Sequence, residues 1–157
     1  MKYLLFITLI FNSLLISEEL KITAKEFKTD EKAGITTLIG DVNIIKSSDE
    51  INASKITIYT NEKREPTKFI AQGDVSFYIQ TDDKAIYKGV ANKVIYLPIK
   101  KEYHFFKDVH LEQINDKKII IGEEVVLKTI DGEAYAKGAN KEPIIMIFNM
   151  PNNKEKE

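Results

Sequence analysis

The sequence predicts an all-β fold, and three observations support this prediction. Apolar and polar residues alternate along residues 69–80, F-I-A-Q-G-D-V-S-F-Y-I-Q, as they do on a strand that is buried on one face. Similar short runs recur along the chain, separated by polar turns. Residues that favour strands (Val, Ile, Thr, Tyr and Phe) are plentiful, and little of the chain repeats with helical spacing.

A two-strand module repeats along the chain. Its first unit is Gly40-Asp41-Val42, which recurs as Gly73-Asp74-Val75 and as Lys107-Asp108-Val109, at intervals of 33 and 34 residues. This period lies in the range that is typical of repeat architectures. A glycine inside an alternating run indicates a bulge or a sharp bend.

The second unit of the module lies between the copies of the first. Residues 51–59 align with residues 89–97 and, more weakly, with residues 119–127. The buried parity changes between Ala53 and Ile56 and again between Ala91 and Val94. We interpret both changes as bulges in equivalent places.

We expect about ten short strands joined by polar turns, mostly as up-and-down hairpins, in a sandwich, barrel or roll. The strands that we delimit cover residues 19–27, 35–45, 51–59, 69–80, 85–97, 102–113, 118–129, 133–137 and 144–148. Asp30 and Gly34 mark a turn over residues 28–34, and Asp131-Gly132 marks a tight turn. Pro98 ends the strand before it, because proline cannot donate to the ladder.

The two ends of the chain differ from the middle. Residues 1–17 carry Lys2 and then an apolar run that is too short for a typical membrane span, as in a signal peptide. Leu15 and Ser17 form an imperfect cleavage site, so a retained anchor stays an alternative. We expect the mature protein to start near Glu18 outside the cytoplasm, with one domain over residues 18–148 and a disordered polar tail over residues 149–157.

The composition and the motifs do not favour catalysis. The chain has a net charge of −1, which gives no reason to expect a nucleic-acid partner, and it has no cysteine. His104 and His110 have no further histidine or cysteine to complete a metal site. The repeat explains the recurring aspartates as bend residues, and no phosphate loop or nucleophile motif is present. We therefore expect no enzyme activity, no cofactor and no metal.

The apolar parity of the strands has two interpretations. Two sheets can fill each other's inner face as a closed core, or they can splay and leave an apolar groove that is open to a lipid. Both arrangements require the same apolar residues, so the pattern alone does not choose between them.

The order of the modules resembles the OstA-like family of periplasmic lipopolysaccharide-transport proteins, the LptA family. The resemblance rests on Ala71-Gln72-Gly73-Asp74-Val75, on the related residues 38–42, and on the interleaved units that contain Ala53 to Tyr59 and Ala91 to Tyr96. It covers residues 20–148, and the third module departs from the pattern at Lys107. It implies a twisted β-jelly roll of two splayed antiparallel sheets, in which the acyl chains of lipid A lie inside the roll and the sugars project outside.

The resemblance also implies where the protein acts. It implies a periplasmic carrier that joins end to end with its own copies and with like-folded components at the inner and outer membranes. The alternatives are an LptC-like component with a retained inner-membrane anchor, and a structural or adhesive module of the envelope. A secreted hydrolase is the poorest interpretation, because no nucleophile–base set is present.

Two sets of residues carry this hypothesis. The residues expected to line the lipid groove are Ile44, Ile56, Ile58, Phe69, Val75, Phe77, Ile79, Val94, Phe105, Val109 and Leu111. The residues expected at the edges where copies join are Leu20, Ile22, Ile145 and Ile147. Exposed strand edges offer unpaired backbone groups, to which another strand can add.

Overall fold

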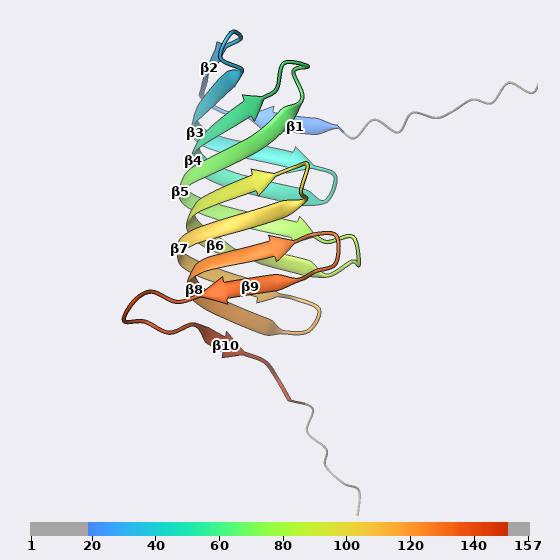
Figure 1. The fold of residues 1–157 in the computed structure, drawn as a ribbon, viewed down its shortest axis with the longest axis vertical. Helices are drawn as coiled ribbons and strands as arrows, with labels where there is room; N and C mark the ends of the chain where they lie inside the picture. The colour runs from blue at the N-terminus through green and yellow to red at the C-terminus, as the bar shows by residue number, and fades with distance from the viewer. Residues whose placement is uncertain (1–18, 151–157) are drawn as a thin grey trace, which may run out of the picture.

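The computed structural model describes residues 19–150, and within this range it contains ten strands (Figure 1). The strands are β1 (Leu20–Thr23), β2 (Glu26–Asp30), β3 (Ile35–Lys46), β4 (Asp49–Thr60), β5 (Pro66–Gln80), β6 (Ile86–Leu97), β7 (Glu102–Gln113), β8 (Lys118–Lys128), β9 (Ala134–Lys137) and β10 (Ile145–Ile147). The all-β prediction is confirmed. No helix in the described range is long and apolar enough to cross a membrane.

All ten strands belong to one antiparallel sheet. Its order is β1-β3-β4-β5-β6-β7-β8-β10, with β2 paired to β3 and β9 paired to β8. The strands from β3 to β8 follow one another as hairpins, as the polar turns predict. In Figure 1 they stack along the long axis of the molecule, from β1 and β2 at one end to β9 and β10 at the other.

Each long strand bends near its middle, where the pairing register shifts. In β3, β5 and β7 the shift falls at Gly40-Asp41, Gly73-Asp74 and Lys107-Asp108. All six residues have positive φ, between 45° and 81°. On the facing strand a single residue lies opposite each pair, so each site is a bulge, and a bulge bends and twists its strand.

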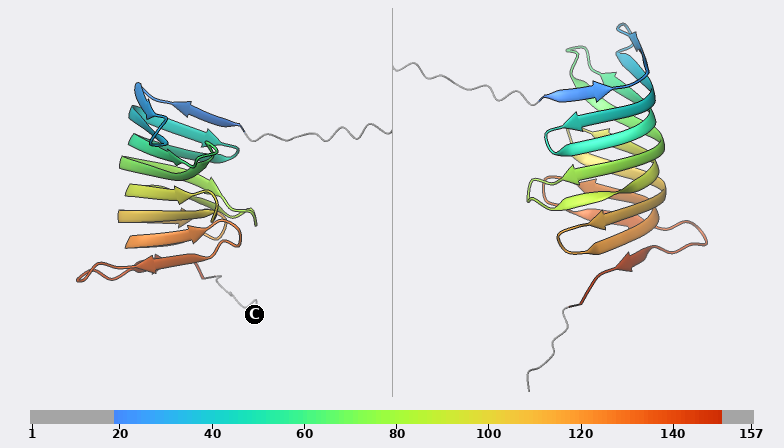
Figure 2. Two further views of the ribbon diagram at one scale, coloured as in Figure 1. Left: turned by 45° about the horizontal axis from the view of Figure 1, so that its top comes forward. Right: turned by 180° about the vertical axis from the view of Figure 1, so that it is seen from behind.

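The aligned bends divide the sheet into two arms, whose strands curve round on one side while most hairpin tips gather on the other (Figure 2). The arm that we call the β2 arm contains β2 and β9 and residues 35–39, 55–60, 66–72, 93–97, 102–106 and 124–128. The β1 arm contains β1 and β10 and residues 42–46, 49–53, 75–80, 86–91, 109–113 and 118–122. The expected pair of splayed sheets is therefore one sheet folded along its row of bulges.

The core lies between the inner faces of the two arms. It is made of alternate residues from both arms, and its most deeply buried members include Val75, Phe105, Val109 and Leu127, each with an exposed fraction of 0%. Burying a side chain of this size stabilises a fold by about 1.5–3 kcal/mol. The period-two pattern of the sequence thus becomes the inner lining of a roll.

The structure corrects two predictions and leaves one untested. The expected strand over residues 19–27 is two strands, since the chain crosses from the β1 arm to the β2 arm at residues 24–25, where the Lys25 amide donates to the Gly40 carbonyl at 3.0 Å. The expected turn over residues 28–34 is shorter, because β2 runs to Asp30 and only residues 31–34 form the turn. The predicted signal peptide, and all of the predicted tail after residue 150, lie outside the described residues.

The bulges predicted at residues 53–56 and 91–94 occur where we expect them, but the extra residue of each lies on the neighbouring Gly-Asp strand. The parity does change between Ala53 and Ile56 and between Ala91 and Val94, and the register shifts there. The two-residue side of each bulge, however, is the Gly-Asp strand. Gly73 fits because a Cβ at this position would lie 2.9 Å from the Ser54 side chain, besides the strain of its positive φ.

Candidate functional site

An apolar cleft of about 230 Å³ opens between the two arms, toward the N-terminal end of the roll. The β1 arm contributes Leu20, Ile44 and Ile51. The β2 arm contributes Ile56, Phe69, Ala71 and Val94. Because these are inward-facing residues of alternating strands, the same pattern that builds the core also builds the cleft.

The wall of the cleft on the β2 arm is aromatic. The Tyr96 and Tyr103 rings stack with their centroids 4.3 Å apart, and the Phe69 ring lies 5.9 Å from Tyr96. Pro66 and Pro98 complete the rim at the strand ends. Aromatic side chains offer a large rigid apolar surface, so this wall suits a hydrocarbon chain.

A polar link between Tyr103 and Asp49 joins the arms at the rim of the cleft. The Tyr103 hydroxyl, on the β2 arm, donates to Asp49 Oδ2 on the β1 arm at 3.0 Å. Asp49 Oδ1 accepts a hydrogen bond from the backbone N–H of Gln80 at 2.8 Å. Burial, and then the negative charge of Asp49, raise the pKa of Tyr103 well above its usual value, so the tyrosine stays neutral and keeps donating.

Toward the C-terminal end aromatic rings fill much of the interior, and a smaller cavity of about 190 Å³ lies there beside Tyr87 and Met146. The Phe77 ring from the β1 arm meets the Phe105 ring from the β2 arm with centroids 4.4 Å apart. These residues are 4% and 0% exposed, so their contact fills the space between the arms. Tyr87 is also buried there, and its hydroxyl donates to the Gly132 carbonyl at 3.4 Å.

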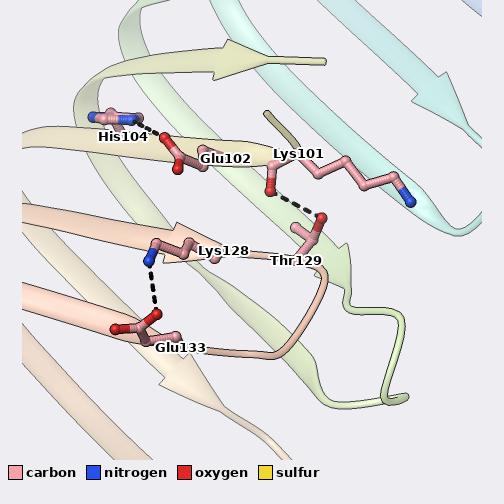
Figure 3. Close-up of polar contacts among 6 residues, drawn as sticks. All are labelled: Lys101, Glu102, His104, Lys128, Thr129 and Glu133. Carbon is pink, nitrogen blue, oxygen red and sulfur yellow. Dashed lines mark hydrogen bonds and ion pairs between the residues drawn. The ribbon is translucent and has the colours of Figure 1, made fainter. Parts of the chain in front are cut away.

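The hairpin tips also close the mouth of this half. The Asp82 amide donates to the Thr129 carbonyl at 2.8 Å, and the Thr129 amide donates to the Lys101 carbonyl at 2.9 Å. Thr129 Oγ1 donates to the same Lys101 carbonyl at 3.1 Å (Figure 3), and Lys101 Nζ lies 3.1 Å from Asp82 Oδ2. We call Asp82, Lys101 and Thr129 the latch.

The structure places all eleven predicted groove residues in the buried interior. Four of them line the cleft: Ile44, Ile56, Phe69 and Val94. The other seven pack away from it: Ile58, Val75, Phe77, Ile79, Phe105, Val109 and Leu111. The sequence prediction did not include Ile51, Ala71, Tyr96 and Tyr103 in the groove, although their inward parity could have included them.

The predicted edge residues lie on terminal strands of the β1 arm. Leu20 and Ile22 face inward on β1, opposite Lys46 and Ile44. On β10, Ile145 and Ile147 lie opposite Ile121 and Ile119 on the outer face, and they are about half exposed. The inward residue of β10 is Met146, which the prediction missed and which lies near Leu111 and Ile120.

The polar residues considered for chemistry are dispersed. Asp41, Asp74 and Asp108 lie at separate bends and are exposed. His104 Nε2 lies 3.2 Å from Glu102 Oε2 (Figure 3), whereas His110 lies exposed further along the same strand. Within residues 19–150 no group of three or more His, Cys, Asp or Glu side chains could hold a metal ion.

Two comparisons with known proteins bear on this geometry. Residues 21–133 match the model of the family described as LptA/(LptD N-terminal domain) LPS transport protein. The fold is similar to the crystal structure of LptH from Pseudomonas aeruginosa, described as the LptA homologous periplasmic component of the conserved lipopolysaccharide transport device. That match has a TM-score of 0.75 and 16% identity, and it covers 85% of this chain and 96% of that chain. No curated protein sequence matches significantly.

The family match spans the bends, the latch and every cleft residue except Leu20, and the structural likeness shows that the fold is the expected β-jelly roll of the OstA-like type. This chain belongs to the LptA/LptD N-terminal domain family of lipopolysaccharide-transport proteins.

Proposed function

We propose that this protein is a periplasmic carrier that shields the acyl chains of lipopolysaccharide between its two arms and passes them from the inner to the outer membrane. The single observation that supports this proposal most is the apolar cleft, which is open to solvent, whereas Phe77 and Phe105 fill the interior beside it. Burying acyl chains is worth about 0.8 kcal/mol per CH₂, so a lipid crosses water only when its chains are covered.

Assembly of several copies would extend the covered path. The inward residues Leu20 and Ile22 on β1, and Met146 on β10, place apolar side chains at both ends of the β1 arm. Edge strands accept further strands through backbone hydrogen bonds. We propose that copies join end to end, and that like-folded components at the two membranes join in the same way.

The carrier function can be tested by photo-crosslinking in cells that make lipopolysaccharide. A crosslinking amino acid at Val94, which is 1% exposed in the cleft, should capture lipopolysaccharide. The matched control is Val90 on the same strand, which is 51% exposed and faces outward. Equal capture at the two positions, or capture at Val90 alone, would contradict the proposal.

The assembly can be tested with a charge on the terminal strand. Ile147→Lys should weaken self-association, because a charged side chain on an edge strand opposes the addition of another strand. The control is Val90→Lys, which adds the same charge on the outer face away from both ends. An oligomer size in solution that Ile147→Lys leaves unchanged would count against end-to-end joining.

The two alternative functions give different results. A structural or adhesive module would carry no lipid between its arms, and lipid extraction of the purified protein would then yield no lipopolysaccharide. An LptC-like component would keep its N-terminal apolar run. The mass of the mature protein and its fractionation with membranes distinguish that case from a chain that starts near Glu18.

A further inference from the structure

A second, polar cavity of about 510 Å³ lies over the mouth of the roll, directly outside the apolar cleft. Its lining comes from the tips of the β3–β4, β5–β6 and β6–β7 hairpins and from the turn after β8. Lys46, Asp49, Tyr96 and Pro98 line both cavities. A molecule with an apolar part in the cleft would therefore place its adjoining polar part in this cavity, which we call the basin.

The charged groups of the basin favour an anion. Its lining holds three lysines, Lys46, Lys84 and Lys101, against two aspartates, Asp49 and Asp82. Both aspartates already have partners within the protein. Asp49 accepts hydrogen bonds from the backbone N–H of Gln80 and from the Tyr103 hydroxyl. Asp82 forms an ion pair with Lys101 at 3.1 Å. With three lysines against two aspartates, the lining carries one excess positive charge.

The neutral groups are also suited to a polar anion. Ser47 and Ser48 form the tip of the β3–β4 hairpin between Lys46 and Asp49, and they add hydroxyl donors to the lining. Lysine ammonium groups recognise phosphate as compact point charges, and hydroxyl and backbone donors add hydrogen bonds to its oxygens. At about 510 Å³ the basin is within the range of small-molecule sites.

We propose that the basin binds the phosphorylated head group of the lipid whose acyl chains lie in the cleft. This inference rests on the proposed carrier function and adds to it a defined place and chemistry for the head group. Lys46 ends β3 in the β1 arm, Lys84 lies in the turn between two strands of that arm, and Lys101 lies in a turn of the β2 arm, so a bound phosphate group bridges the mouth. The Lys101–Asp82 pair does not prevent this, because both side chains are about half exposed and such pairs are weak.

The test compares two lipids with the same acyl chains, lipid A with its phosphates and a phosphate-free counterpart, on the purified full-length protein. Hydrogen bonds to charged groups predict that the wild type binds the phosphorylated lipid about tenfold more tightly at low salt. The variant K46Q/K84Q/K101Q should lose this preference and keep its affinity for the phosphate-free lipid. The control K55Q, an exposed lysine on β4 outside the basin, should keep the preference.

The outcomes separate the head-group site from the carrier function. If the wild type binds both lipids equally well, the head-group site is wrong and the carrier function stands. If the wild type binds neither lipid, both proposals are wrong. Inorganic phosphate that binds to the basin without any preference for the phosphorylated lipid would assign the basin to free phosphate and overturn the head-group assignment. Thermal unfolding of each variant checks that the substitutions leave the fold intact.

Discussion

The open and the closed halves of this roll are built from the same repeated module, yet the apolar cleft of about 230 Å³ lies in only one of them. Two residues before each bend, the module carries Leu38, Ala71 and Phe105 in turn. Ala71 lines the cleft, whereas Phe105 fills the interior and meets Phe77 from the opposite arm. The size of a few inward side chains therefore decides whether a module encloses a cavity or a core.

The contacts between the hairpin tips also differ between the two halves. Over the closed half, the latch joins the two arms through Asp82, Thr129 and Lys101. Beside the cleft, the arms are joined at the rim by the bond between Tyr103 and Asp49. The following predictions test how far the two halves differ.

The largest expected effect is the loss of a ring from the closed half. Phe105→Ala should destabilise the protein by about 3–5 kcal/mol, because it leaves a cavity in a packed core. Phe69→Ala should cost clearly less, because Phe69 already borders the empty cleft and its surroundings have fewer contacts to lose. Urea unfolding of the two variants measures this difference. Equal losses would show that the cleft is as well packed as the core.

The bends provide a second comparison, between a glycine and a lysine in equivalent places. Gly73→Ala should cost about 1–2 kcal/mol, because φ is +81° and the new Cβ would lie 2.9 Å from Ser54. Lys107 has a φ of 62° at the third bend, so Lys107→Gly should be neutral or stabilise by up to about 1 kcal/mol. Unfolding midpoints measure both effects, and a destabilising Lys107→Gly would contradict this account of the bends.

The smallest effect on stability is expected where the cleft is filled. Ala71→Phe should change the free energy of unfolding by less than about 1 kcal/mol, because the new ring enters existing space, whereas overpacking a closed core costs 1–3 kcal/mol. The same variant should lose most of the lipopolysaccharide that is captured by a crosslinker at Val94. A stable Ala71→Phe variant that still gives full capture at Val94 would place the lipid elsewhere.

Much of the fold could be predicted from the sequence because alternation and turn residues are local signals. The strand over Glu102–Gln113 was predicted with its observed bounds, and every strand from β3 to β10 was found within three residues at either end. The break between β1 and β2 was missed because Leu20, Ile22 and Ala24 alternate up to the crossing, and residues 19–27 contain no glycine or proline. The crossing at residues 24–25 depends instead on a distant partner, Gly40.

The site could be predicted only in part, since a groove and a core use the same inward residues. Ile44 and Phe77 occupy equivalent module positions, yet one borders space and the other closes it. Whether a cavity or a packed core forms depends on the residue that lies opposite on the other arm. The sequence of one chain does not show which residue lies opposite Ala71 or Phe105. The latch was missed for the same reason, because Asp82 and Thr129 belong to separate turns.

Each bend in the sheet lies at two neighbouring residues of one strand, so the number of stacked strands can change without a change in the terminal strands. Duplicating or deleting one module of 33 or 34 residues would add or remove two strands and leave both terminal strands unchanged. A roll built from such modules can change its length by whole modules and keep the same terminal strands for contacts with its neighbours.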